Sequence, residues 1–212
     1  MSKIIPAILT NNLETFKTQI KQMEGATDWV QIDVSDGIFV PQKTLGAEEI
    51  KTVITNLKYE LHLMVADPTT EIEKWYNLSN VKRIIFHYEA AKIPLSIVKH
   101  IEAYGFDAGV AVNPDTGLEN LAALAYQADL ILFMSVIPGK QGQKFIPETL
   151  NKIKEFKTKY PNVPVAVDGG VHQEEIKQLA ALGVEYMDVG SEIFANPNPR
   201  EHLKELQHLI YA

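Results

Sequence analysis

The chain has 212 residues, of which 46% are hydrophobic and 22% charged, and it contains no cysteine. This composition is typical of a globular domain with a substantial core, and the missing cysteines exclude disulfides and thiolate catalysis. We expect one domain over residues 1–212, because barrels of parallel strands form single units of roughly 200 to 250 residues.

The net charge of -7 disfavours long-range attraction to phosphate backbones, so we expect no nucleic-acid partner. The first nine residues carry one cation, Lys3, and an apolar run that Pro6 interrupts. That run is too short for a signal peptide, and no later segment approaches the ~18 apolar residues of a membrane span. The sequence therefore predicts a cytoplasmic protein without a membrane partner.

Short apolar runs alternate with amphipathic stretches of helical length along the whole chain. The expected strands cover residues 4–9, 29–34, 59–64, 83–87, 106–112, 130–136, 165–167 and 186–189. The expected helices cover residues 13–23, 48–57, 70–78, 94–104, 117–125, 147–159, 173–182 and 199–210. About eight strands with as many helices predict an α/β fold of the (β/α)8 TIM-barrel class, with a closed sheet of eight parallel strands.

An open doubly wound sheet also alternates strands with helices. It usually has about five or six strands and often a glycine-rich turn after the first. Here residues 10–12 follow the first strand and contain no glycine. The strand number and this turn favour the barrel.

Polar residues stand near the ends of the second and third strands, where a parallel barrel places its site. The period of two in a strand puts Gln31, Asp33 and Ser35 on one face of the second strand. His62 and Met64 share a face of the third strand. A lone buried histidine is more often a hydrogen-bonded core residue than a ligand. These polar residues therefore indicate a functional site only when they are taken together.

The later strands end in groups suited to an anion. Asp168 precedes Gly169 and Gly170, whose backbone N–H groups can approach a phosphate closely. Gly190 and Ser191 end the eighth strand before a short helical stretch, a common phosphate position in barrels. Two aspartates and a histidine on one rim indicate a proton-transfer site.

Two loops complete the predicted rim. The segment 138–143, after the sixth strand, is predicted to fold over a ligand as a mobile lid. Asp36 and Gly37 follow the second strand, and we interpret this pair as a turn without a chemical role.

The sequence resembles the ribulose-phosphate 3-epimerase family over nearly its whole length. The matching stretches are residues 6–9, 33–41, 62–65, 86–90, 112–116, 134–139, 167–171 and 190–194. Each stretch alone is modest, but their order and spacing together are specific. The resemblance implies an isomerase that interconverts D-ribulose 5-phosphate and D-xylulose 5-phosphate at C3, and it suggests a homo-oligomer.

The resemblance also implies the roles of particular residues. Asp33 and Asp168 are the pair that moves the C3 proton through an enediolate. A divalent metal (zinc, manganese or iron) is expected on Asp33, His62 and Asp168, with Gln31 at the fourth position. The residues implied to contact the sugar phosphate are Ala7, Met64, Met134, Gly139, Gly142, Gly169, Gly170, Gly190 and Ser191.

The chain departs from the family at positions near the reacting end of the substrate. Gln31 replaces the first metal histidine, and an amide oxygen binds zinc less well than an imidazole nitrogen. Ala7 replaces a serine and Ser35 a methionine. In the lid, Lys140 replaces an aromatic residue and Gln141 a glycine, which strains the loop if that glycine has positive φ.

Asp188 stands at a position of the eighth strand that is usually apolar in the family. It either pairs with a nearby cation, which the sequence favours, or faces inward as a third carboxylate. The clustered departures leave open two alternatives: an enzyme acting on another ketose phosphate, or a protein that binds a sugar phosphate without catalysis. The retained aspartate pair argues against the second alternative, because a binder needs neither carboxylate.

Overall fold

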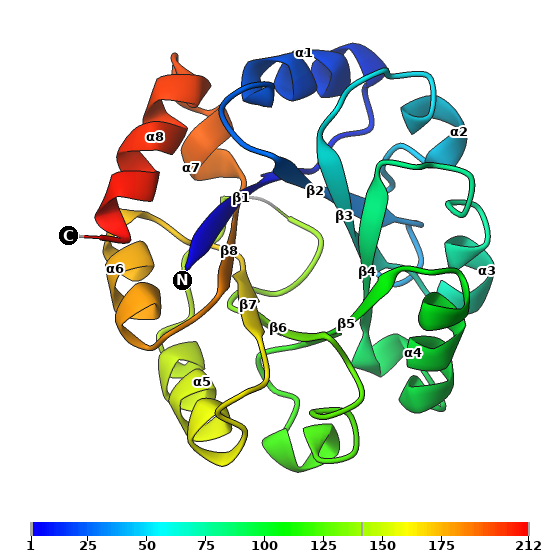
Figure 1. The fold of residues 1–212 in the computed structure, drawn as a ribbon, viewed down its shortest axis with the longest axis vertical. Helices are drawn as coiled ribbons and strands as arrows, with labels where there is room; N and C mark the ends of the chain where they lie inside the picture. Colours follow the sequence, from blue (N-terminus) through cyan, green and yellow to red (C-terminus); the bar gives the residue numbers. More distant parts are fainter. Residues whose placement is uncertain (1, 141, 212) are drawn as a thin grey trace.

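Eight parallel strands close into a barrel with helices around it, as the computed structural model of residues 2–140 and 142–211 shows (Figure 1). The strands are β1 (Lys3–Ile8), β2 (Trp29–Ser35), β3 (Lys58–Met64), β4 (Val81–His87), β5 (Asp107–Val112), β6 (Leu130–Met134), β7 (Val165–Asp168) and β8 (Tyr186–Val189). Neighbours in sequence pair throughout, and β8 pairs with β1 to close the sheet. The predicted TIM barrel is confirmed.

The helices cover the outside of the sheet. They are α1 (Leu13–Met23), α2 (Ala47–Ile50), α3 (Pro68–Ile72), η1 (Tyr88–Ala90), α4 (Pro94–Ala103), η2 (Leu118–Leu121), α5 (Glu148–Lys159), α6 (Gln173–Ala181), α7 (Ser191–Phe194) and α8 (Pro199–Leu209). In α1 the side chain of Asn12 caps the first turn, and the buried Phe16, Ile20 and Met23 form its inner face.

Three of the expected helices are shorter than predicted. The helix expected over 48–57 ends at Ile50, shortly before a run rich in β-branched residues, 52–55. The helix expected over 70–78 becomes the five-residue α3 followed by turns, in which Trp75 is buried and donates to Glu71. The helix expected over 117–125 contains only the 3-10 turn η2.

The barrel interior is divided into an apolar and a polar side. Residues from β4 to β7 pack the apolar side: Ile85, Ala111, Leu130, Leu132, Met134 and Ala166. On the polar side, buried Arg83 donates through Nη1 to Glu60 at 2.5 Å. The Arg83 guanidinium also lies 5.2 Å from the ring centre of Trp29 and 4.4 Å from that of Tyr186.

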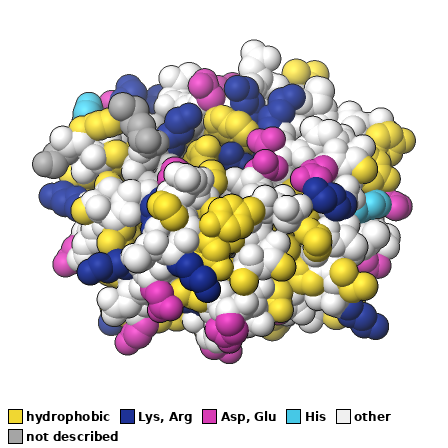
Figure 2. All heavy atoms as spheres, turned by 60° about the horizontal axis from the view of Figure 1, so that its bottom comes forward, with side chains coloured by type: hydrophobic (Ala, Val, Ile, Leu, Met, Phe, Trp, Pro, Cys, Tyr) yellow, Lys and Arg dark blue, Asp and Glu magenta, His cyan; other side chains and the backbone are white. Residues whose placement is uncertain are grey.

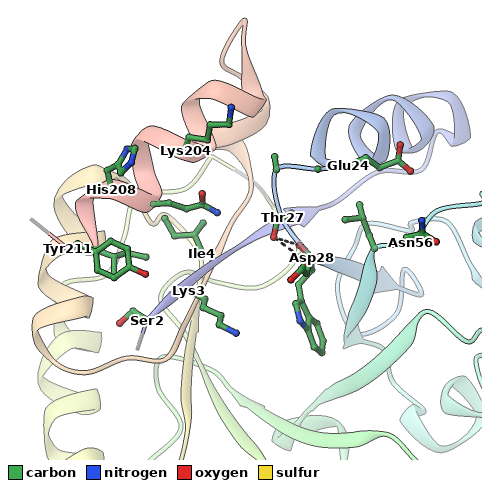
Figure 3. Close-up of a pocket in the computed structure, with 16 residues that line it drawn as sticks. Ser2, Lys3, Ile4, Glu24, Thr27, Asp28, Asn56, Lys204, His208 and Tyr211 are labelled. Atoms are coloured by element: carbon green, nitrogen blue, oxygen red, sulfur yellow. Dashed lines mark hydrogen bonds between the residues drawn. The ribbon is translucent and has the colours of Figure 1, made fainter.

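A cleft of about 940 Å³ lies at the end of the barrel where the strands begin (Figure 3). Its wall combines the starts of β1 and β2 with the end of α8, including Lys3, Asp28 and His208. The hydroxyl of Thr27 bonds there to the backbone of Trp29. Among residues 2–140 and 142–211, one group of three side chains could hold a metal ion, and it lies outside this cleft.

The outer surface carries both signs of charge. Figure 2 shows Lys and Arg side chains interspersed with Asp and Glu, and apolar side chains between them. In the part of the chain that the structure describes, every helix is too short or too polar to cross a membrane.

We predict that Arg83→Met destabilises the protein strongly, because Glu60 stays buried without its cation. Breaking a buried ion pair from one side costs about 3–5 kcal/mol, and the free energy of unfolding in urea should fall by that order. The double variant Glu60→Gln/Arg83→Met removes both charges and should recover most of the loss. A single variant as stable as the wild type would contradict this role of the pair.

Candidate active site

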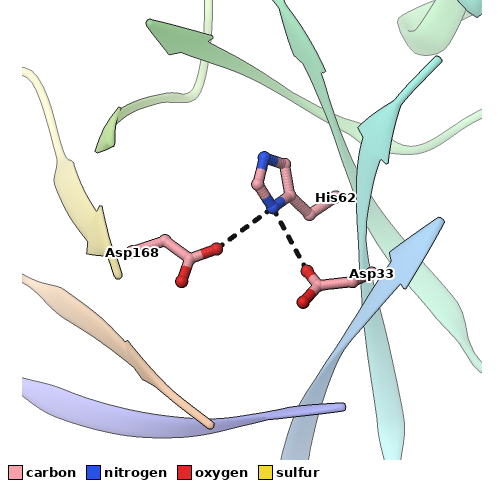
Figure 4. Close-up of side chains that lie close together, drawn as sticks. All are labelled: Asp33, His62 and Asp168. Atoms are coloured by element: carbon pink, nitrogen blue, oxygen red, sulfur yellow. Dashed lines mark hydrogen bonds and ion pairs between the residues drawn. The ribbon is translucent and has the colours of Figure 1, made fainter. Parts of the chain in front are cut away.

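Two carboxylates and one imidazole meet inside the barrel near the ends of the strands (Figure 4). The Nδ1 atom of His62 lies 3.2 Å from Asp33 Oδ1 and 3.1 Å from Asp168 Oδ2. One ligand atom from each of these residues lies within 4.8 Å of the others. His62 is fully buried, and only small fractions of the two aspartate side chains are exposed.

The strand register brings these residues together. Asp33 on β2 pairs with His62 on β3, so their side chains stand next to each other on the inner face. Asp168 is the last residue of β7 and approaches from across the barrel. The residues that the sequence placed on one rim therefore converge on one point.

Gln31 lies beside this group and is fully buried. Its Nε2 donates to Asp33 Oδ1 at 3.0 Å and to Asp168 Oδ2 at 2.9 Å. Its Oε1 has no hydrogen-bond partner among the described residues. The amide thus crosslinks the two carboxylates and leaves one buried acceptor unused.

Burial and charge shift the protonation of the group. Burial raises the pKa of Asp33 to about 6, although His62 and Gln31 donate to its carboxylate. Burial alone would lower the pKa of His62, but hydrogen bonds to Asp168 and Asp33 outweigh it and raise that pKa to about 10. At neutral pH the imidazolium therefore neutralises part of the carboxylate charge.

The residues present fit a divalent metal. Two carboxylate oxygens and an imidazole nitrogen are ligands that zinc, manganese and iron accept. A half-turn of the Gln31 amide would exchange Nε2 for the unpartnered Oε1 and offer a fourth, weaker ligand. An ion at this place must displace the hydrogen that His62 Nδ1 shares with the carboxylates.

A pocket opens above the group and contains every residue that the resemblance implied for substrate contact. Its wall includes Ala7, Asp33, Met64, Met134, Gly139, Gly142, Asp168, Gly169, Gly170, Gly190 and Ser191. The same wall carries Lys140, Asp188 and Glu192. The structure brings the predicted contacts together, and their roles stay predictions.

Two of these glycines are required by close backbone packing. Gly169 has φ +112°, and a Cβ there would lie 2.3 Å from Val136 Cγ2. Gly170 has φ +62°, and a Cβ there would lie 2.5 Å from Phe145 N. Any side chain at either position would collide with the segment that follows β6, so the chain can pass here only as glycine.

The two loops predicted at the rim are the lid over 138–143 and the turn at Asp36 and Gly37. Gln143 donates through Nε2 to the carbonyls of Ile137 at 2.6 Å and Lys140 at 2.9 Å, so the predicted lid is folded on itself beside the pocket. The strain predicted for Gln141 lies outside the described residues. The predicted turn at Asp36 is confirmed, since its carboxylate accepts from the N–H of Ile38, 2.8 Å away.

Asp188 faces inward, and the cation pairing that the sequence favoured is wrong. Its side chain lines the pocket, is 1% exposed and has no hydrogen bond on either oxygen among the described residues. Arg83, the cation of the barrel interior, donates to Glu60 instead. Burial raises the pKa of Asp188 well above its usual value, and the charges of Glu60 and Asp168 add to this effect.

Sequence reasoning missed two residues next to the site. His87 ends β4, and its Nε2 lies 2.9 Å from His62 Nε2. Its Nδ1 lies 3.3 Å from Glu89 Oε2. Burial lowers the pKa of His87 to about 4, and hydrogen bonds from His87 and Thr116 overcome burial to lower the pKa of Glu89 to about 2. The position of His87 at a strand end was the available signal.

Comparison with known proteins identifies the family. A sequence model described as the ribulose-phosphate 3 epimerase family matches residues 3–194. The chain is 33% identical to a ribulose-phosphate 3-epimerase of Eremothecium gossypii, over 93% of this chain and 88% of that protein. It is 32% identical to the cytoplasmic isoform of Oryza sativa subsp. japonica, over 99% and 94%. The chain belongs to the ribulose-phosphate 3-epimerase family.

Solved structures agree on the fold. KGPDC from Streptococcus mutans superimposes with a TM-score of 0.77 at 15% identity, covering 100% of this chain and 98% of that one. The 3-hexulose-6-phosphate synthase of Salmonella typhimurium gives a TM-score of 0.75 at 17% identity, covering 99% and 98%. At these identities the likeness concerns the barrel alone.

We predict that Gln31→His binds Zn²⁺ more tightly than the wild type, by about tenfold or more, because imidazole nitrogen is a better zinc ligand than an amide oxygen. Competition with a chelator of known affinity measures the change. Gln143→His adds a histidine to the lid and serves as the control. Equal affinity of Gln31→His and the wild type would show that position 31 does not reach the ion.

Proposed function

We propose that this member of the family is an isomerase that interconverts D-ribulose 5-phosphate and D-xylulose 5-phosphate. One observation carries the proposal: Asp33 and Asp168 reach the same point from opposite sides of the pocket, with His62 between them. A sugar carbon held in the pocket above this group would have one carboxyl group on each face, which is the arrangement that inversion requires.

The reaction follows from this pair. One aspartate, as carboxylate, takes the hydrogen from C3 as a proton, and the C–H electrons form a C2–C3 double bond while the C2 carbonyl becomes an oxyanion. The other aspartate, as carboxylic acid, returns a proton to C3 from the opposite face. The electrons flow back, the carbonyl reforms and C3 is inverted. The pair has then exchanged protonation states.

The surroundings suit carboxyl groups that exchange protons near neutral pH. The pKa of Asp33, which burial raises to about 6, lies close to the pH at which a base works most efficiently. Gln31 donates to both carboxylates, and the single Nδ1 hydrogen of His62 is shared between them, so the two side chains hold the orientation of the pair. A divalent ion on Asp33, His62 and Asp168 would stabilise negative charge on the sugar oxygens.

The phosphate end of the substrate is proposed to lie against the glycine-rich part of the pocket wall. Gly142, Gly169, Gly170, Gly190 and Ser191 line it without bulky side chains that would cover the backbone N–H groups. In the described part of the pocket wall, Lys140 is the one lysine or arginine, beside four carboxylates. A dianionic substrate can therefore contact one cationic side chain, Lys140, in the described part of the pocket wall.

Two further properties belong to the proposal. The resemblance suggests a homo-oligomer, and the sequence suggests a cytoplasmic protein. Light scattering coupled to size-exclusion chromatography measures the first property, and a monomeric mass would contradict it.

We predict that Asp168→Asn loses epimerisation by roughly 10²- to 10⁴-fold, because asparagine cannot exchange a proton with C3. Asp33 remains able to take the C3 proton of one epimer. In D₂O, proton NMR should therefore show that one epimer loses its C3 hydrogen to solvent while no inversion occurs.

Asp33→Asn should show the same behaviour with the other epimer. The control is Asp107→Asn, at the exposed start of β5. Wild-type turnover in either active-site variant would contradict the two-carboxylate mechanism. A wild-type protein that binds the sugar phosphate but neither exchanges nor inverts C3 would contradict the proposed activity itself.

We also predict that Lys140→Gln raises KM for the sugar phosphate by roughly tenfold and leaves kcat nearly unchanged. A cation that touches only the phosphate contributes equally to the ground state and the transition state. Lys144→Gln is the matched control, because Lys144 lies on the same exposed loop but outside the pocket wall. A lower kcat with unchanged KM would assign Lys140 to the reacting end.

A further inference from the structure

We propose that Glu89 is a positioning residue that acts through His87 to keep Nδ1 of His62 available for a metal ion. The proposal rests on the assignment of His62 as a ligand in the proposed function. The proposal concerns the direction of the hydrogen bonds from Glu89 through His87 to His62. Of these three side chains, only His62 faces the carboxylate pair.

The two imidazoles share a single hydrogen. The Nε2 atoms of His62 and His87 lie 2.9 Å apart, and both side chains are fully buried. At that distance one nitrogen must donate and the other must accept. Phe39 packs against the His87 ring at a centroid distance of 4.9 Å, and the two imidazole rings are stacked at 5.0 Å. The packing holds the contact in place.

Glu89 decides which of the two nitrogens donates. Its Oε2 lies 3.3 Å from His87 Nδ1, and a carboxylate can only accept. His87 must therefore carry its hydrogen on Nδ1, which leaves its Nε2 as an acceptor. The donor between the rings is then Nε2–H of His62, so an ion that displaces the hydrogen on Nδ1 finds the lone pair there, on the atom that faces Asp33 and Asp168.

The loop after β5 fixes the direction of Glu89. The Oε1 atom accepts from the backbone N–H of Asn113 at 2.9 Å and from the hydroxyl of Thr116. Both groups are donors, so they require an acceptor at Oε1. Only Oε2 remains free to face His87.

This anchoring makes Glu89→Gln a directional test. The Asn113 N–H and the Thr116 hydroxyl should hold the new amide oxygen in the place of Oε1, and the amide nitrogen then faces His87 Nδ1 as a donor. His87 must now accept at Nδ1 and carry its hydrogen on Nε2. His62 must then accept at Nε2, so its single remaining hydrogen is the one on Nδ1, where it blocks the metal.

The first measurement uses the metal-free wild-type protein with ¹⁵N-labelled histidine. The nitrogen chemical shifts should place the hydrogen of His87 on Nδ1 and a hydrogen on both nitrogens of His62; in Glu89→Gln the hydrogen of His87 should move to Nε2, and His62 should keep a hydrogen only on Nδ1. A wild-type spectrum with the hydrogen of His87 on Nε2 would overturn the proposal without any variant, so a poorly folded variant cannot leave it undecided.

The second measurement is the dissociation constant for Zn²⁺, obtained by chelator competition without substrate. Glu89→Gln should weaken binding by about 10- to 100-fold, the usual effect of losing such an outer partner. Glu89→Asp retains a group that only accepts and should restore much of the affinity. The matched control is Glu205→Gln, which also faces a histidine Nδ1, that of His202 at 3.0 Å, but lies on α8.

The outcomes separate this proposal from the proposed function. Unchanged Zn²⁺ affinity in Glu89→Gln overturns the positioning role even if the protein is an active epimerase. A His87 hydrogen that moves to Nε2 in Glu89→Gln, together with weakened metal binding, supports it even if no epimerisation is found, because neither measurement uses the sugar phosphate.

Discussion

Two carboxylates with oxygens within 4.8 Å of each other, inside a closed barrel, are the constraint on which the site depends. Such a pair repels itself and loses hydration, so it needs donors from the protein or a cation. His62 and Gln31 each reach both aspartates and supply those donors. Gln31 is on β2, the strand that also carries Asp33, and His62 is on the neighbouring β3. Their positions therefore follow from strand register rather than from flexible loops. The reacting end of the pocket is therefore rigid by construction.

The division of the barrel interior follows from the same constraint. Polar side chains fill the side near β2, β3, β4 and β8, where Arg83 and Glu60 lie below the carboxylate pair, while aliphatic side chains fill the side from β4 to β7. A wholly apolar interior would pack as well but would leave Asp33 and Asp168 in surroundings of lower polarity. The Arg83 ion pair, whose guanidinium lies over two aromatic rings, places fixed charge beneath the site.

Much of this arrangement was predictable from the sequence, and the remainder depends on contacts between distant residues. The period of two in β2 and β3 places Gln31, Asp33 and His62 inward, and the aspartate at the end of β7 follows from the barrel itself. The partners of these side chains do not follow: Gln31 and Asp168 are 137 positions apart, and the contact between His62 and His87 depends on ring orientation. The expected helix over 48–57 was wrong for a local reason, since a run rich in β-branched residues follows Ile50. The cation pairing expected for Asp188 was wrong because its sequence neighbours do not reveal that buried Arg83 already pairs with Glu60.

Gln31 gives the site a property that a histidine at the same place lacks. One amide nitrogen has two hydrogens and donates to both aspartates at once, whereas one imidazole nitrogen has at most one hydrogen to share. An ion that enters between the carboxylates must break both of these bonds and also remove the hydrogen on His62 Nδ1 before the unpartnered Oε1 can turn toward it. Each step opposes metal binding, so the free energy gained from the ligands is reduced by the stability of the hydrogen-bonded arrangement. Replacement of histidine by glutamine therefore weakens metal binding in two ways. Glutamine is a poorer ligand, and its two hydrogen bonds stabilise the metal-free arrangement.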